Sequence, residues 1–406
     1  MTTDRAGARH QTRGLATTAV HAGERPPRPD FTPTSMPIYP ASAFIYEDST
    51  IQDAIFGNER PGYVYTRYAN PTIRAFEEAV AALEDTEDAI AFASGMGAIY
   101  AAIMLDAKAG DTIVAAPDVY GATYAILSRI APDHGINVRF CDMRDLAALE
   151  RVVAETKPSL VLCETMSNPL MRIANVAEVA RIAHAGGAKM MIDNTFASPM
   201  LVNPAKFGAD SVVHSGTKYI GGHGDATGGV VAASEERVAA LREINKLIGA
   251  VLSPFDAWIL LRGVKTLPLR VRQHSANARE VARWLAADPR VARVNYAGLN
   301  PPSAVDAQFN SADRGGMISF EIAGAGKEDV FRFQDSLRLV LPATTLGDVW
   351  SLVLFPANSS HRAVPAEDRA TIGIGDNLVR LSVGIEDVQD IITDLDQALA
   401  ATVAGM

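Results

Sequence analysis

Short apolar segments alternate with segments of helical periodicity through the first two thirds of the sequence. The apolar segments are AIAFA (89–93), TIVAAP (112–117), NVRFCD (137–142), SLVLCET (159–165), AKMMIDN (188–194), DSVVH (210–214) and GGVVAAS (228–234). Helical patterns such as GAIYAAIMLDA and DLAALERVVAET follow several of them. The strands are apolar throughout rather than alternating, as expected when helices cover both faces of a mostly parallel sheet. The pattern predicts an α/β domain.

The region before this domain differs in composition and periodicity. Residues 15–70 are rich in Pro, Tyr and Thr and have little periodicity, which predicts an extended arm rather than a packed unit. A helix is predicted to start at Asn70, because Asn is a good helix cap and Pro71 suits a first helical turn. Apolar residues then recur at helical spacing at Ile73, Phe76 and Val80.

The last third predicts a second, smaller lobe. A long helical segment runs from Ser253 past Pro268, and this proline is expected to bend or break it. The segments GGMISFEIA, VRLSVGIED and VQDIITDLDQALAATV then predict an α+β lobe of ordinary domain size. The expected organisation is an arm (1–70), an α/β domain (71–262) and a C-terminal α+β domain (263–406).

Composition narrows the possible partners. The chain has 406 residues, 48% of them hydrophobic, and a net charge of -10, which disfavours nucleic acid and anionic membranes as partners. No apolar run approaches the roughly 18 residues that span a bilayer, and the polar first residues lack a secretory signal. The expected location is the cytoplasm. Two cysteines, Cys141 and Cys163, lie in apolar runs and are expected to be buried thiols rather than a disulfide or zinc pair.

Polar residues gather where the predicted strands end. Glu164, Asp193 and the group from Ser215 to Lys218 each follow an apolar segment. Parallel sheets bind ligands beyond the carboxyl ends of their strands. A lysine among small hydroxyl and glycine residues at such an end calls for a chemical role, because an ordinary lysine belongs on a solvated face.

These groups suit a phosphorylated aromatic aldehyde bound to a lysine amine. In a dry pocket near positive charge, Lys218 loses its proton easily and becomes nucleophilic. Ser215 and Thr217 offer hydroxyls to a phosphate, and the helix start in ASGMGAI, with Ser94, makes an anion site. Asp193 is placed to keep a ring nitrogen protonated, as pyridoxal phosphate requires. An aromatic face for the ring is available in DVYGATY at 118–124.

Each signal alone has a simpler reading. SGMG is a common tight turn and lacks the third glycine of a dinucleotide fingerprint. Asp193 alone is compatible with capping a loop, and Tyr120 alone with packing. His214 and His223 have no acid or cysteine that completes a ligand set, so no metal is expected. The convergence of lysine, acid, aromatic and phosphate turn at strand ends favours the functional interpretation.

Eight motifs together resemble the Cys/Met-metabolism family of pyridoxal-phosphate enzymes. They are YTRYANPT, ASGMGAI, DVYGAT, ETMSNP, IDNTFASP, HSGTKYIGGHGD, LSPFDAWILLRGVKTL and RLSVGIED. The family includes cystathionine γ-synthase, cystathionine γ-lyase, methionine γ-lyase and O-acylhomoserine sulfhydrylases. The resemblance implies the type I fold of pyridoxal-phosphate transferases, similar to aspartate aminotransferase, and pyridoxal 5'-phosphate as the cofactor.

The resemblance also implies residue roles. Lys218 binds the cofactor covalently and moves protons, and Tyr120 stacks on the ring and acts as an acid or base at the leaving group. The residues implied in cofactor binding are Tyr65, Arg67, Gly95, Met96, Tyr120, Glu164, Asn168, Asp193, Ser215, Thr217 and Lys218. Of these, Tyr65 and Arg67 reach the phosphate site of a neighbouring subunit, in a homotetramer built from two dimers. Arg380 binds the substrate carboxylate, with Thr345 nearby.

The expected reaction is γ-elimination from a methionine- or cystathionine-like L-amino acid, giving 2-oxobutanoate, ammonia and a thiol. The alternative within the family is γ-replacement on an O-acylhomoserine. A non-enzymatic binding protein and a pyridoxal aminotransferase are the alternatives outside it, and the complete set of motifs disfavours both.

Several positions depart from the named relatives. Thr344 lies where cystathionine-handling members typically carry glutamate, and Ala122 lies where methionine γ-lyases typically carry cysteine. The segment 347–362 is bulkier than usual for the family, which predicts a reshaped distal substrate pocket with Trp350 and Phe355 as candidate lining residues.

Overall fold

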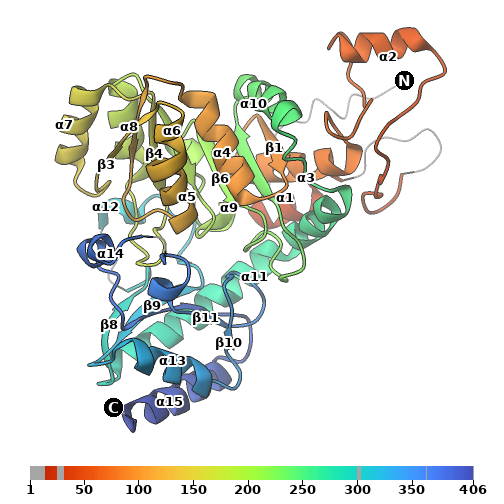
Figure 1. Ribbon diagram of the computed structural model, residues 1–406. Coiled ribbons are helices and arrows are strands. Elements are labelled where there is room, and N and C mark those ends of the chain that lie inside the picture. Colours follow the sequence, from red (N-terminus) through yellow and green to blue (C-terminus); the bar gives the residue numbers. More distant parts are fainter. Residues whose placement is uncertain (1–13, 25–31, 300–302, 363, 406) are drawn as a thin grey trace.

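The computed structural model describes residues 14–24, 32–299, 303–362 and 364–405. Its larger sheet has seven strands in the order β1-β7-β6-β5-β4-β2-β3 (Figure 1). These are β1 (Asp88–Phe92), β7 (Gly229–Ala233), β6 (Ser211–Ser215), β5 (Lys189–Asp193), β4 (Leu160–Glu164), β2 (Thr112–Ala115) and β3 (Asn137–Phe140). Only β7 runs antiparallel to its neighbours in this sheet. The predicted mostly parallel sheet is therefore confirmed.

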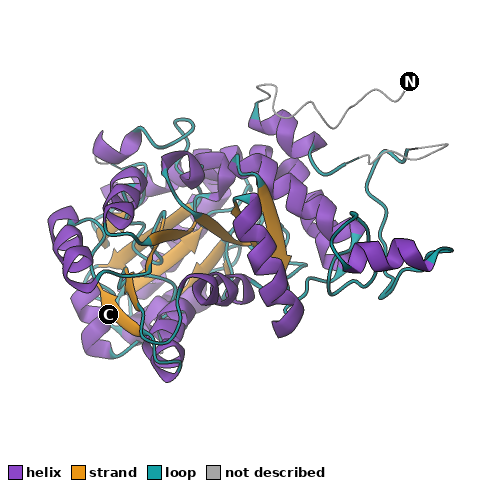
Figure 2. Cartoon of the chain, turned by 90° about the horizontal axis from the view of Figure 1, so that it is seen from above, coloured by secondary structure: helices purple, strands orange, loops and turns teal. Residues whose placement is uncertain are grey.

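Helices lie on both faces of this sheet, as Figure 2 shows. They are α3 (Pro71–Glu84), α4 (Gly95–Asp106), α5 (Gly121–Ala125), α6 (Ala131–Asp133), α7 (Leu146–Thr156), α8 (Val176–Ala185), α9 (Ser198–Leu201) and α10 (Glu235–Ile248). As predicted, Asn70 caps α3, because its side chain accepts the backbone N–H of Thr72. The prediction of strands buried on both faces fails at β3, where Asn137, Arg139 and Phe140 are exposed. Because β3 is an edge strand, helices do not enclose it.

A five-stranded sheet forms the core of the C-terminal part, in the order β10-β11-β12-β9-β8. Its strands are β10 (Leu341–Pro342), β11 (Leu352–Leu354), β12 (Leu378–Ser382), β9 (Met317–Ile322) and β8 (Val291–Asn295). The helices here are α12 (Ser303–Asp306), α13 (Lys327–Ser336), α14 (Ala366–Ile372) and α15 (Val388–Val403). Buried apolar side chains from this sheet, α15 and the second half of α11 (Pro254–Ala287) form a core of their own.

The long helix α11 connects the two parts without interruption. It contains Pro268, so the expectation of a break at this proline was wrong. The proline removes one backbone N–H, and the helix tolerates this loss because packing on the core holds the turn in place. Pro268 itself and Val271 are buried, and Arg270 donates to the carbonyl of Gly263 at 2.8 Å. Because α11 spans residue 262, the division into domains at that point stays a prediction.

The N-terminal segment contains two helices, α1 (Leu15–His21) and α2 (Ser49–Phe56). Helix α1 packs against α3 and α11 and buries Ala19, which differs from the expected extended arm. Seven residues are too few to show periodicity in sequence, and such a helix is stabilised by its packing. Helix α2 lies away from the body of the molecule (Figure 1), whereas Met36 packs in the main core.

Both cysteines are buried free thiols, as expected from the apolar runs in which they lie. Within the described ranges, no helix is long and apolar enough to cross a membrane. In the same part of the chain, no group of His, Cys, Asp or Glu side chains is arranged to hold a metal ion.

Candidate active site

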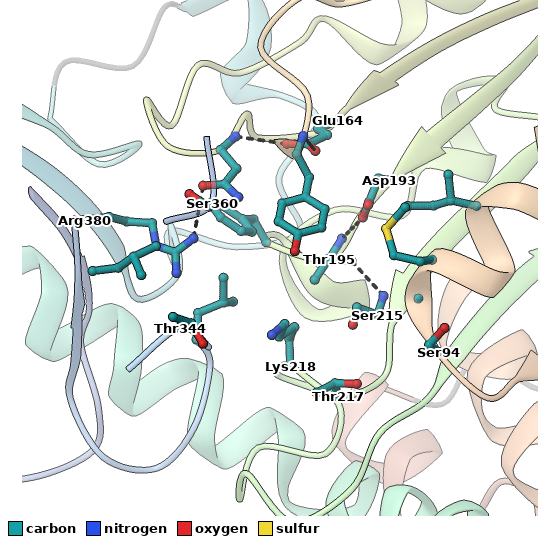
Figure 3. Close-up of a pocket in the computed structure, with 18 of the residues that line it drawn as sticks. Ser94, Glu164, Asp193, Thr195, Ser215, Thr217, Lys218, Thr344, Ser360 and Arg380 are labelled. Carbon is teal, nitrogen blue, oxygen red and sulfur yellow. Dashed lines mark hydrogen bonds between the residues drawn. The ribbon is translucent and has the colours of Figure 1, made fainter. Parts of the chain in front are cut away.

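A cavity of about 430 Å³ lies at the carboxyl ends of β4, β5 and β6, beside the C-terminal sheet (Figure 3). Most of the residues singled out from the sequence line it together. These are Gly95, Met96, Tyr120, Glu164, Asn168, Asp193, Ser215, Thr217, Lys218 and Arg380. The strand ends converge as expected for a parallel sheet. Thr345 joins them through Lys218, whose Nζ lies 3.0 Å from the Thr345 hydroxyl.

Lys218 lies in the turn that follows β6, where its backbone N–H donates to the Ser215 carbonyl. Burial and the positive charge of Arg380 lower the pKa of the Lys218 amine from 10.5 to about 8. The carboxylate of Asp348 acts in the opposite direction and raises this pKa. The unprotonated amine, which a nucleophile or base requires, is therefore far more abundant near neutral pH than for an ordinary lysine.

One end of the cavity is built to hold an anion. Ser94 caps α4, accepting the backbone N–H of Gly97 at 3.1 Å, so the positive end of this twelve-residue helix faces the cavity. The hydroxyls of Ser215 and Thr217 come from the turn after β6. At Gly95, a Cβ atom would lie 2.8 Å from the Cβ of Ser215. Glycine is therefore required for the two segments to approach this closely.

Two carboxylates stand side by side at the bottom of the cavity, because Glu164 and Asp193 are register partners on β4 and β5. Glu164 accepts the backbone N–H groups of Tyr120 at 2.6 Å and Asn168 at 3.0 Å. Asp193 accepts the backbone N–H of Thr195 at 2.9 Å. Burial raises the pKa of both carboxyl groups, and the charge of Asp193 raises that of Glu164 further. A cationic ring nitrogen beside Asp193 would relieve this burial of negative charge.

Arg380 projects from β12 into the opposite side of the cavity and is itself buried. Its guanidinium donates to the Asn168 side chain and to the Thr345 carbonyl, both at 3.1 Å. Burial lowers the pKa of Arg380 to about 10, and its Nε is buried without a partner among the described residues. A buried guanidinium with a free N–H is suited to bind a carboxylate.

Two residues singled out from the arm lie outside this cavity. Arg67 donates to the backbone carbonyl of Lys246 and lies 4.9 Å from the ring centre of Tyr68. Tyr65 is exposed, with 43% of its surface accessible. Within one chain, neither residue reaches the cavity that contains Lys218.

The prediction that Trp350 and Phe355 line the distal pocket was wrong. Phe355 is buried in the C-terminal core, where its ring packs edge-on against Phe331 at 5.7 Å. Trp350 is half-exposed and lies next to Gly224. The same segment instead contributes Leu354 and two serines, 359 and 360, to the cavity. Phe355 directly follows Leu354, and successive side chains of an extended segment point to opposite sides, which sends the Phe355 ring into the core.

Sequence reasoning missed several residues that shape the site, among them Thr195, Ser360 and Asp348. Thr195 lines the cavity and its hydroxyl accepts the backbone N–H of Ser215 at 2.8 Å, and its position two residues after Asp193 was an available signal. Ser360 also lines the cavity, although only its segment was recognised. Asp348 is fully buried, and neither of its carboxylate oxygens has a hydrogen-bond partner among the described residues. No local pattern marks Asp348.

Comparison with known proteins gives consistent results over nearly the whole chain. Residues 16–400 match the family described as Cys/Met metabolism PLP-dependent enzyme. O-succinylhomoserine sulfhydrylase of Pseudomonas aeruginosa is 41% identical over 388 residues, 95% of each chain. L-methionine gamma-lyase of Pseudomonas putida is 40% identical, covering 96% of this chain and 98% of its own. The crystal structure of cystathionine gamma synthase from Xanthomonas oryzae pv. oryzae, in complex with aminoacrylate and cysteine, superimposes with a TM-score of 0.91. That structure has 38% identity and covers 98% of this chain and 100% of its own.

Proposed function

Because the chain belongs to the Cys/Met metabolism PLP-dependent enzyme family, we propose that it catalyses γ-elimination from a methionine- or cystathionine-like L-amino acid. The products are 2-oxobutanoate, ammonia and a thiol, with one water consumed. The observation that carries this proposal is the half-buried Lys218 amine, whose pKa is lowered to about 8, between an anion site and the buried Arg380.

The residues of the cavity fit pyridoxal phosphate. The phosphate would lie against Ser94, Gly95 and Met96 at the start of α4, where a Cβ at residue 95 would fill the space next to Ser215. Asp193 would hold the ring nitrogen, because burial raises the pKa of this carboxyl group and a neighbouring cation would stabilise its charged form. When bound, the cofactor supplies an electron sink for the carbanions formed at Cα and then at Cβ.

The side chains of the protein then position the substrate and move protons. Arg380 binds the α-carboxylate through its fork of N–H groups, while the amide of Asn168 holds the guanidinium in place. Lys218 Nζ is placed to take the Cα proton, and Thr345 holds this amine through a 3.0 Å contact. Tyr120, at the start of α5 on the cavity wall, is the candidate for giving a proton to the departing γ-substituent.

The second candidate function is γ-replacement on an O-acylhomoserine. Its specific support is the 41% identity to a protein named O-succinylhomoserine sulfhydrylase. The identity to the methionine gamma-lyase of Pseudomonas putida is nearly the same, at 40%. Both reactions begin with the same proton removals and differ in what attacks after the γ-substituent has left. Water-linked breakdown gives the ketoacid, and attack by a thiol gives a new amino acid.

A substrate panel distinguishes the two reactions. The holoenzyme is incubated with L-methionine, L-cystathionine and O-acetylhomoserine, with and without added thiol, and 2-oxobutanoate is followed. Ketoacid from a thioether substrate supports elimination, and Lys218→Ala should abolish it. Ketoacid formed only from the ester and suppressed by thiol would instead establish replacement.

The site is proposed to be shared between subunits. Helix α2 lies away from the body, and the segment after it carries Tyr65 and Arg67. The Arg67 guanidinium binds a backbone carbonyl but no acid among the described residues. An arginine so placed suits the phosphate of a neighbouring subunit. The proposed assembly is a homotetramer of two such dimers, located in the cytoplasm. Arg67→Ala should weaken cofactor retention, and mixing Arg67→Ala with Lys218→Ala chains should restore part of the activity. Absence of rescue after verified subunit exchange would argue against a shared site.

A further inference from the structure

A second set of polar side chains lies directly behind the cavity, at the ends of β4, β5 and β6. Each of these strands places one polar residue in the cavity and an adjacent polar residue outside it. Successive side chains of an extended segment point to opposite faces of a sheet, so the adjacent residues face away from the cavity. The residues in the cavity are Glu164, Asp193 and Ser215, and the adjacent ones are Thr165, Asn194 and His214.

The carboxylate of Glu84, the last residue of α3, joins these adjacent residues. Its Oε1 lies 2.6 Å from Nε2 of His214 and accepts the side-chain amide of Asn194 at 2.8 Å. The Thr165 hydroxyl donates to Oδ1 of Asn194 at 2.7 Å. These four residues, called here the Glu84 network, are each at most 1% exposed. A neighbouring subunit therefore cannot contact them.

Glu84 occupies an unfavourable position for a carboxylate. It is fully buried, and it lies at the C-terminal end of a helix, which carries partial negative charge. Hydrogen-bond donors compensate for this position, because His214 and Asn194 face Oε1 and the amide of Asn203 lies 3.5 Å from Oε2. Nδ1 of His214 is buried without a partner among the described residues, so the hydrogen bond to Glu84 alone holds the imidazole. The carboxylate thus fixes three separate segments.

The Glu84 network is connected to Asp193 through the backbone. Asn194 directly follows Asp193 in the chain. Thr195 then donates its backbone N–H to the Asp193 carboxylate at 2.9 Å, and its hydroxyl accepts the backbone N–H of Ser215 at 2.8 Å (Figure 3). His214 directly precedes Ser215. The orientation of the Asp193 carboxylate therefore depends on two segments that the network holds together.

Titratable side chains face Asp193 from both neighbouring strands. Glu164 is its register partner on β4, and His214 lies on β6. Burial raises the pKa of Asp193, whereas hydrogen bonds from Thr195 and the charge of His214 lower it. The network therefore favours the ionised form of Asp193, which is the form that stabilises a cationic ring nitrogen.

Resting on the pyridoxal-phosphate site of the proposed function, we propose that Glu84 and His214 are positioning residues for the ring nitrogen of the cofactor. They hold the Asp193 carboxylate in the orientation that keeps a proton on this nitrogen. Neither residue lines the cavity, so both act through Asp193. Disruption of the network lets this carboxylate turn away, and the protonated ring then loses stabilisation.

The protonation of the ring nitrogen can be measured on the bound cofactor itself. The protein is reconstituted with pyridoxal phosphate whose ring nitrogen carries an NMR label, and its chemical shift is followed against pH. Glu84→Gln places an NH2 group where donors already point. This variant should lower the pH midpoint for loss of the ring proton by at least about one unit, a tenfold change in the equilibrium.

Glu77→Gln is the matched control. Glu77 is a second buried carboxylate on α3, but it accepts the backbone N–H of Ala91 and pairs with Arg242. This variant should leave the midpoint as in the wild type. An unchanged midpoint in Glu84→Gln would overturn the proposal, and so would an equal fall in both variants.

A milder variant tests the network if Glu84→Gln does not fold. Thr165→Val removes the hydroxyl that donates to Asn194 and should lower the midpoint by at least about half a unit. Its control is Thr123→Val, because the Thr123 hydroxyl is also buried but has no partner among the described residues. Equal midpoints in Thr165→Val and the wild type would contradict the proposal.

These measurements need bound cofactor but no turnover. A protein that shows the expected shifts but forms no 2-oxobutanoate would refute the proposed elimination and leave the positioning role intact. A wild-type protein that binds no pyridoxal phosphate would refute both.

Discussion

The lowered pKa of Lys218 leads to a prediction about how the protein takes up its cofactor. The shift from 10.5 to about 8 corresponds to about 3 kcal/mol of bias against the ammonium form. At pH 7 about a tenth of the amine is free, which is about 300-fold more than for a lysine of pKa 10.5. Only the free amine attacks an aldehyde, so the rate of cofactor uptake by the apoenzyme should rise with pH and level off above about 8.

Two variants should move the midpoint of this pH dependence, which reports the pKa of Lys218, in opposite directions. Arg380→Gln removes a positive charge that lowers the pKa of Lys218, so the midpoint should rise. Asp348→Asn removes a negative charge that raises this pKa, so the midpoint should fall. Asparagine has the same shape as aspartate, and glutamine keeps a polar side chain at residue 380 although it is shorter than arginine.

The assay mixes apoenzyme with pyridoxal phosphate and follows the visible absorbance of the bound cofactor across pH. Rates are divided by those of a free model amine at the same pH, expressed per unprotonated amine, which corrects for ionisation of the cofactor itself. A wild-type midpoint near 10 would refute the reasoning, because it would mean that burial does not disfavour the ammonium. Shifts of both variants in the same direction would refute the assigned electrostatic roles.

Three further predictions concern the scaffold. Gly95→Ala should weaken cofactor binding at least about tenfold by equilibrium titration, because the added Cβ would crowd Ser215 at 2.8 Å. Gly97→Ala is the control, because its Cβ would meet no atom closer than 3.4 Å, and equal losses would contradict the steric argument. Ser94→Ala should lower the free energy of unfolding by about 1 kcal/mol through loss of the α4 cap, measured by denaturant titration. Phe320→Ala should cost about 3–5 kcal/mol in the C-terminal core, and a loss under 1 kcal/mol would show that the core refills the space.

Local patterns were sufficient for the larger part of the fold. The apolar runs that predicted strands at 89–93, 159–165 and 188–194 became β1, β4 and β5, because a buried parallel strand needs apolar residues on both faces. The carboxyl ends of such strands meet at one edge, so Glu164, Asp193 and Lys218 were expected to be neighbours before any coordinates were known. Local patterns failed where tertiary contacts override the conformational preference of a residue or segment. Examples are Pro268 inside α11 and the exposed edge strand β3.

No local sequence pattern predicted the contacts between the larger α/β part and the C-terminal part of the chain. Lys218 meets Thr345 across 127 positions, and Arg380 meets Asn168 across 212. Arg380 and Thr345 were named through resemblance to a family, and no local pattern placed them near the lysine. Asp348 and Ser360 were recognised only as part of the segment 347–362 and not as individual site residues, because their neighbours come from segments distant in sequence.

The sequence by itself determined the sheet, its helices and the strand ends that hold the reactive groups, because hydrophobic periodicity and turn residues act over a few positions. Only the tertiary structure decided the pKa of Lys218 and the position of Arg380. These depend on how the C-terminal sheet packs over the carboxyl ends of the larger one, which removes water from both. Burial and the distances between charges are properties of that packing, and they set the chemistry of the site.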